Sequence, residues 1–191
     1  IGAHRGTEAA VYDWFNKAVL WVEADPNIFE ELRINIKKHY NQKAICALLG
    51  DKTKTKIPFY VSNNDGACSS MFNFTDEIKK SDMWSGRDYK MTKKIKLQSI
   101  TLDSLLLNNK IEAKNYNHWI MDLQGSELKA LKGATNSLKF CKSIYIEVST
   151  KKFYEDSVLW NDLDKWLNER KFYCTTTPQK DEEDILYLKK N

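Results

Sequence analysis

Glycine and proline are scarce in this 191-residue chain, which holds seven glycines and three prolines. Because 42% of the residues are hydrophobic, this composition excludes a disordered or collagen-like chain and favours one packed domain spanning residues 1–191. A strong excess of one charge is also missing, since 30 basic residues stand against 26 acidic ones. The small, evenly spread excess predicts no nucleic-acid partner.

Cysteine is scarce as well, and none of the four cysteines forms a C-x-x-C pair. Cys46 and Cys141 fall inside apolar runs, so we expect them to pack as free thiols rather than to form disulfides or a zinc site. No uncharged apolar run approaches the ~20 residues that span a bilayer, and no signal-peptide pattern is present. These absences predict a cytoplasmic protein without a membrane span.

Apolar runs typical of strands alternate with helical patterns along the chain. The strands are predicted at 18–23, 44–49, 57–62, 95–97, 118–123 and 143–148, and the helices at 9–15, 26–39, 126–139 and 158–167. This alternation favours a mostly parallel α/β sheet with helices on both faces. Two last strands, 172–176 and 185–188, are predicted to close as an antiparallel hairpin.

The first residues carry a glycine turn directly before a helical pattern. Gly2 and Gly6 would let a ligand approach the backbone there, and Glu23 ends the following strand 21 residues after Gly2. In nucleotide-binding α/β folds an acidic residue at that distance binds ribose hydroxyls, so the pattern indicates an adenosine-type ligand. A dinucleotide would require G-x-G-x-x-G, whereas S-adenosylmethionine, which has no phosphate, tolerates the missing middle glycine.

Several segments of the chain together resemble the FkbM-type family of S-adenosylmethionine-dependent methyltransferases. These segments are Gly2–Gly6 (GAHRG), Val22–Pro26 (VEADP), Ile100–Leu105 (ITLDSL), Ile120–Gly133 (IMDLQGSELKALKG) and Ile144–Ser149 (IYIEVS). The resemblance implies the class I methyltransferase (Rossmann-like) sheet, with S-adenosyl-L-methionine as cofactor and S-adenosyl-L-homocysteine as product. In that fold a central strand precedes Gly2, so we expect it upstream of Ile1, in a longer polypeptide of which this domain is an N-terminally incomplete part.

The resemblance also implies a set of cofactor-binding residues. They are Gly2, Ala3, His4, Gly6, Thr7, Glu23, Ala24, Ala47 and Asp122. At His4 the family usually has asparagine, so this residue has two interpretations: a loop side chain that bonds locally, or a base facing the transferred methyl group.

Three residues are candidates for catalysis: Asp122, His4 and Glu147. Asp122 and Glu147 lie at or near the carboxyl ends of predicted central strands, where open α/β sheets bind ligands. A carboxylate there can orient a hydroxyl or act as general base. The alternatives are a helix N-cap for Asp122 and a strand-end charge paired with a lysine for Glu147. Together with Glu127 they could also form a Mg²⁺ site, although we expect no metal.

The stretch from Gly66 to Tyr89 mixes aromatic side chains with serines. It contains Cys68, Ser69, Ser70, Met71, Phe72, Phe74, Met83, Trp84 and Tyr89. Such a stretch suits a lid over the acceptor or a sugar-stacking surface, and suits a packed irregular loop equally well. We expect the acceptor to contact Ser69, Ser70, Gln124 and Glu127.

Three functions are consistent with these patterns. The first is O-methylation of a hydroxyl on a sugar, a glycan or another small metabolite, since no N/D-P-P-Y/F tetrapeptide of base-amine methyltransferases is present. The second is an NAD-type Rossmann oxidoreductase, which the missing middle glycine disfavours. The third is a non-catalytic adenosine-binding domain of a larger protein.

Overall fold

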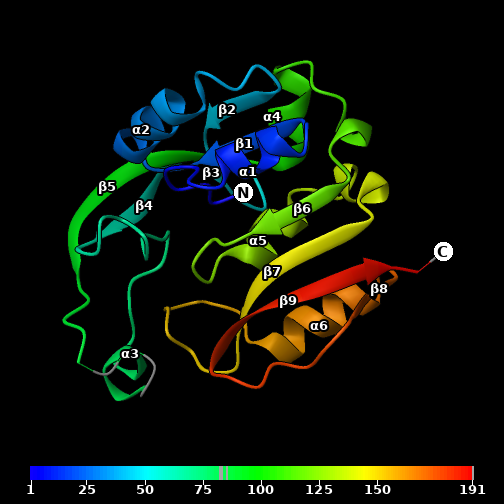
Figure 1. The fold of residues 1–191 in the computed structure, drawn as a ribbon. Coiled ribbons are helices and arrows are strands. Elements are labelled where there is room, and N and C mark those ends of the chain that lie inside the picture. The colour runs from blue at the N-terminus through cyan, green and yellow to red at the C-terminus, as the bar shows by residue number, and fades with distance from the viewer. Residues whose placement is uncertain (82–83, 85, 191) are drawn as a thin grey trace.

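The computed structural model describes residues 1–81, 84 and 86–190. The elements in chain order are α1 (Ala9–Trp14), β1 (Val19–Glu23), α2 (Pro26–Ile36), β2 (Gln42–Cys46), β3 (Leu48–Leu49), β4 (Lys54–Ser62), α3 (Glu77–Lys80), β5 (Met91–Ile100), α4 (Leu102–Asn108), η2 (Ala113–Asn115), β6 (His118–Met121), α5 (Glu127–Lys132), η3 (Ser137–Phe140), β7 (Ser143–Ser149), α6 (Trp160–Asn168), β8 (Phe172–Cys174) and β9 (Glu182–Lys189), as Figure 1 shows. Met83, which the sequence placed in the aromatic lid, lies outside the described residues.

The strands form three small mixed sheets, ordered β1-β2, β3-β5-β4 and β6-β7-β9-β8. The pairs β1-β2, β3-β5 and β6-β7 are parallel, while β4-β5, β7-β9 and β8-β9 are antiparallel. The expected C-terminal antiparallel hairpin is therefore confirmed. The expectation of a mostly parallel sheet is confirmed in part, because among the described strands only β4, which pairs with β5, and β9, which lies between β7 and β8, run in the opposite direction to their neighbours. A single Rossmann-like sheet stays a prediction.

Residues 1 and 2 lie between β1 and β6 and join them by hydrogen bonds. The amino group of Ile1 donates to the carbonyl of Ile120 at 2.9 Å, and the N–H of Asp122 donates to the carbonyl of Ile1 at 3.1 Å. On the other side, the N–H of Gly2 donates to the carbonyl of Val22 at 2.9 Å. Ile1 thus occupies the place expected for the carboxyl end of a central strand, and the strand upstream stays a prediction.

Helices cover the sheets unevenly. On β1, Trp21 packs in the apolar cluster of α1 and α2, and Val22 faces the main core on the other side. On β7, Ile144 is fully buried in that core, which the apolar faces of α5 and α6 also line. On the opposite face of the same sheet, Ile120 and Tyr145 remain 50% and 43% exposed. The expectation of helices on both faces therefore holds for β1 and not for the centre of the β6-β7-β9-β8 sheet.

Two predicted elements are interrupted. The predicted strand 44–49 breaks at Ala47, because β2 pairs with β1 whereas β3 pairs with β5. The predicted helix 126–139 ends at Lys132. The next residue must be a glycine, because a Cβ on Gly133 would lie 2.1 Å from the carbonyl oxygen of Gly50. The carboxylate of Asp103, at the start of α4, then accepts hydrogen bonds from the backbone where η3 begins. The sequence did not predict α4.

The four cysteines are free thiols. Cys141 is buried as expected, but Cys46, the last residue of β2, is exposed. Among the described residues, no helix combines the length and the apolar character that crossing a bilayer demands.

Candidate functional site

The glycine turn of residues 2–6 depends on left-handed backbone conformations. Gly2, His4 and Gly6 have φ angles of 74°, 46° and 62°. A Cβ on Gly2 would lie 1.6 Å from the carbonyl oxygen of Asp122, so only glycine permits this approach. The turn is thereby held directly against the carboxyl end of β6, and it brings His4 next to β1.

Glu23 ends β1 beside this turn, and its buried carboxylate is bound by three backbone N–H groups. The N–H of His4 donates to Oε2 at 2.7 Å, while those of Ala24 and Asp25 donate to Oε1 at 2.8 Å each. Burial raises the pKa of Glu23, and these backbone hydrogen bonds act in the opposite direction. Glu23 therefore fixes the glycine turn and the first turn of α2 to the same strand end.

Most of the predicted binding residues line one cavity of about 200 Å³. Those that line it are Gly2, His4, Glu23, Ala24, Ala47, Ser69, Ser70, Asp122 and Gln124. The cavity lies at the carboxyl ends of β1 and β6, where open α/β sheets bind ligands. The geometry therefore unites the two separate sequence patterns, the glycine turn with Glu23 and the D-L-Q-G-S-E segment, in a single site.

Five predicted residues do not line this cavity. Gly6 is buried against Leu32, Ala3 packs against the α1–α2 cluster, and the exposed Thr7 donates its hydroxyl hydrogen bond to its neighbour Glu8. The other two are Glu127 and Glu147, which lie behind Gln124. A contact of these five with a ligand stays a prediction.

The sequence did not single out the apolar wall of the cavity. It includes Leu48 of β3 and Phe59 of β4, together with Met71, which belongs to the predicted lid stretch. Phe59 lies in a predicted strand. Alternation with a period of two predicts which face of the strand its side chain occupies, but not which element packs against that face. The sequence indicated Met71 only as one member of a stretch without a regular hydrophobic period.

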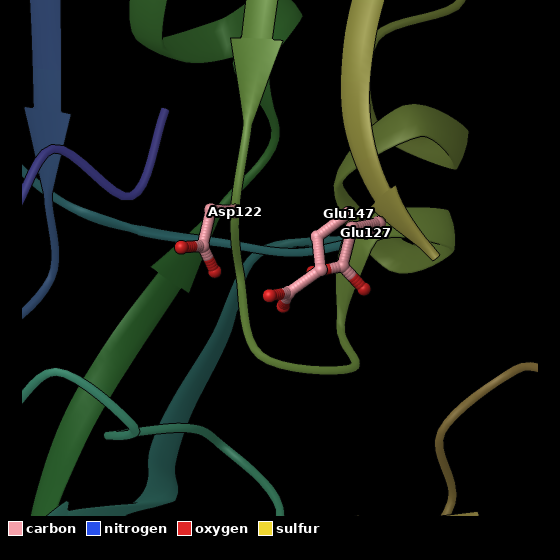
Figure 2. Close-up of side chains that lie close together, drawn as sticks. All are labelled: Asp122, Glu127 and Glu147. Atoms are coloured by element: carbon pink, nitrogen blue, oxygen red, sulfur yellow. The ribbon is translucent and has the colours of Figure 1, made fainter. Parts of the chain in front are cut away.

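The carboxylates of Asp122, Glu127 and Glu147 gather at the carboxyl ends of β6 and β7, as Figure 2 shows. One oxygen from each lies within 4.8 Å of the other two. Glu127 is buried, Glu147 is half-buried and Asp122 is exposed. Burial raises the pKa of Glu127 to about 8, and burial and then the charge of Asp122 hold the pKa of Glu147 well above its ordinary value. Both carboxyl groups therefore keep their protons to a higher pH than an ordinary glutamate does.

Glu127 is tied to the loop that precedes α5. Its Oε1 accepts hydrogen bonds from the N–H of Leu123 at 2.7 Å and of Gly125 at 3.3 Å. Glu127 thus holds the D-L-Q-G-S-E loop from behind rather than facing the cavity. The N-cap of α5 is Ser126, so the alternative of Asp122 as a helix cap is wrong.

Gln124 bridges the other two carboxyl groups. Its Nε2 donates to Oδ1 of Asp122 at 2.6 Å and to Oε2 of Glu147 at 2.8 Å. Its backbone is left-handed, with a φ of 52°, and its carbonyl accepts a 2.7 Å hydrogen bond from the hydroxyl of Ser70. Gln124 was predicted to bind the acceptor; its amide nitrogen is already occupied by protein carboxyl groups.

Oxygen ligands such as this cluster suit Mg²⁺. However, the amide hydrogens of Gln124 point at both Asp122 and Glu147, and one oxygen of Glu127 is taken by backbone N–H groups. To bind an ion, these carboxyl oxygens would have to lose the hydrogen bonds that they accept from the protein. The arrangement therefore fits a hydrogen-bonded carboxyl cluster better than a metal centre.

His4 and the two serines also bond within the protein. The ring Nε2 of His4 lies 2.9 Å from the carbonyl oxygen of Asp65, in the loop that follows β4. The Oγ of Ser69 accepts a 3.1 Å hydrogen bond from the N–H of Ser62, and Ser70 is 1% exposed. The loop therefore lines the cavity and contacts the glycine turn, as a packed loop does, and a lid over the acceptor stays a prediction.

Comparison with known proteins gives two findings. The family described as "Methyltransferase FkbM domain" matches residues 1–174. The crystal structure of Methyltransferase FkbM from Methylobacillus flagellatus KT is similar in fold, with a TM-score of 0.58 and 16% identity. That alignment covers 98% of this chain and 41% of the other, so the chain spans less than half the length of that protein. No curated protein matches the chain.

Proposed function

The chain belongs to the FkbM family of methyltransferases, and from this we propose that it transfers a methyl group from S-adenosylmethionine to a hydroxyl group. The acceptor we propose is a sugar, a glycan or another small metabolite. The observation that carries the proposal is the shared cavity, which Glu23 and Asp122 border from the ends of two different strands.

The lining of the cavity fits an adenosyl cofactor. Glu23 offers carboxylate oxygens for ribose hydroxyls, and Gly2 and His4 of the glycine turn line the cavity beside it. Leu48, Phe59 and Met71 supply an apolar wall suited to an adenine ring. The exposed carboxylate of Asp122 is suited to a positively charged sulfur nearby.

S-Adenosylmethionine, when bound, supplies an electrophilic methyl group on a positively charged sulfur. Asp122 would accept a hydrogen bond from the acceptor hydroxyl and take its proton as the oxygen–carbon bond forms and the sulfur–carbon bond breaks, with S-adenosylhomocysteine as the leaving group. Gln124 holds the Asp122 carboxylate in place. Asp122 is the member of the cluster that we propose as the base, because it alone of the three lines the cavity and burial raises the pKa of both Glu127 and Glu147.

The acceptor site that we propose lies beside the cluster. A second hollow of about 470 Å³ lies on the far side of Glu147 and is lined by Trp84, Tyr145 and the acidic start of β9. Aromatic rings next to carboxylates are a combination that suits sugar hydroxyls and ring faces. This hollow supports a sugar acceptor over a purely apolar one.

Isothermal titration calorimetry with S-adenosylhomocysteine and with NAD tests the cofactor. We expect S-adenosylhomocysteine to bind and NAD to give no heat. Binding of NAD alone would support the oxidoreductase alternative. Transfer is then tested with radiolabelled S-adenosylmethionine and a panel of sugars; tight cofactor binding without transfer to any hydroxyl would support the non-catalytic adenosine-binding domain.

A further inference from the structure

The amide of Gln124 is held at both ends. Its nitrogen donates to Asp122 and Glu147, and its oxygen accepts a short hydrogen bond from the hydroxyl of Tyr154. Tyr154 follows β7, is 1% exposed and has a pKa that burial raises well above its ordinary value, so its hydroxyl remains a neutral donor. The sequence patterns gave Tyr154 no role.

The segment around Tyr154 packs directly on the Gln124–Gly125 turn. A Cβ on Gly125 would lie 2.9 Å from the Cβ of Ser157 and 3.2 Å from that of Tyr154, so only glycine fits between the two segments. Tyr154 is fixed in turn by Phe74, with ring centroids 5.2 Å apart, across an isolated bridge between the two residues. The tyrosine hydroxyl is therefore held by rigid packing at one place relative to the amide.

An amide side chain has one accepting end and one donating end, so its orientation decides what it offers to a carboxylate. An ionised carboxylate only accepts, and an amide oxygen turned toward Asp122 would place two acceptors against each other. The Tyr154 hydroxyl satisfies the oxygen at the opposite end. It thereby selects the orientation in which both hydrogens on Nε2 face the carboxyl groups.

We propose that Tyr154 is a positioning residue: through the Gln124 amide, its hydroxyl orients the carboxyl groups of Asp122 and Glu147 for methyl transfer. The inference rests on the proposed function. Tyr154, in the segment after β7, thus sets the position of the proposed base Asp122, in the loop after β6. Tyr154 itself contacts neither cofactor nor acceptor.

A double-mutant cycle tests whether Tyr154 acts through Gln124. We expect Tyr154→Phe to lower kcat about tenfold while the KM for S-adenosylmethionine changes less than about twofold. In a Gln124→Met background, the same change is expected to have almost no further effect on kcat. Tyr187→Phe is the matched control, since Tyr187 is equally buried and its hydroxyl bonds Trp160 and Asp164 outside the site. Effects of the two changes that multiply independently would overturn the proposal.

A second measurement does not depend on activity. In the nitrogen-15 NMR spectrum of the parent, the side-chain NH₂ of Gln124 is expected to exchange slowly with solvent, and in Tyr154→Phe at least about tenfold faster. Unchanged exchange in the variant would overturn the proposal. A parent protein that shows the protected amide but transfers no methyl group would contradict the proposed function and leave the link from Tyr154 to Gln124 in place.

Discussion

Glu23 and the Asp122–Glu127–Glu147 cluster lie at neighbouring strand ends, yet their surroundings differ. The carboxylate of Glu23 is met by three backbone N–H groups from its own turn and from His4. The carboxyl groups of the cluster instead have one another as neighbours. Backbone donors favour the ionised form of Glu23, whereas burial and then the charge of Asp122 favour the protonated form of Glu147.

This difference assigns binding to one region and proton transfer to the other. Removing a carboxylate from the first region is expected to weaken ligand affinity. Removing one from the second is expected to change turnover or the pH dependence of stability, with less effect on affinity.

The largest effect is expected for Asp122→Asn. Asparagine keeps the size of the side chain and an oxygen that accepts from Gln124, but it removes the negative charge that takes the proton. Turnover should fall by about 100-fold or more, while the affinity for S-adenosylhomocysteine changes far less. The measurement is steady-state kinetics alongside calorimetry, with Asp162→Asn, an exposed position on α6, as control. Near-parent turnover would exclude Asp122 as the base and leave His4 and Glu147 to be tested.

A smaller effect, and one of a different kind, is expected for Glu23→Ala. Loss of the charged acceptor for the ribose should weaken binding of S-adenosylhomocysteine by about 1.5–3 kcal/mol, or roughly ten- to 150-fold in Kd. Calorimetry measures this, and Glu30→Ala, an exposed carboxylate on α2 paired with Arg33, is the control. If Glu23→Ala binds the ligand as tightly as the parent protein, the assignment of ligand binding to the region of Glu23 is wrong.

The third expected effect, for Glu127→Gln, concerns stability. The pKa of Glu127 is about 8 in the folded protein and near 4.5 in the unfolded chain, so the folded state binds more protons between these values. The free energy of unfolding should therefore fall as pH rises from about 4.5 to about 8, by at most about 1.4 kcal/mol per pH unit from this group.

Glutamine keeps the oxygen that accepts from Leu123 and does not titrate, so the variant should lose this part of the slope. Urea unfolding at pH 6 and at pH 8.5 measures the difference. Glu112→Gln, an exposed carboxylate paired with Lys114, is the control. Equal slopes in the parent and in Glu127→Gln would show that Glu127 titrates normally in the folded protein.

The sequence predicts well what depends on neighbouring residues. The valine-rich run with the Asp25–Pro26 helix start predicted β1 and α2, and the Asp25 side chain does accept from the N–H of Asn27 at N2. The paired signals of Gly2 and Glu23 predicted residues that share one cavity. Each of these signals comes from residues within a single turn or a single strand.

What the sequence could not predict depends on contacts between distant segments. The close packing of Gly133 on Gly50 joins residues 83 positions apart, and the break at Ala47 follows from a change of strand partner. The hydrophobic period and the residue propensities within a short stretch of sequence contain no information on such long-range contacts. For the same reason Gln124 was expected to face the acceptor, when Tyr154 and Glu147 already occupy its amide.

The contacts of Gln124 also have a consequence for the order of events during synthesis. Its carbonyl bonds Ser70, 54 positions earlier, and its side chain bonds Tyr154, 30 positions later. Closing loops of that length has an entropic cost that is recovered only when both ends have docked. A chain still on the ribosome therefore holds Asp122 without its bridge until the residues after β7 have emerged, so the site becomes competent only late in translation.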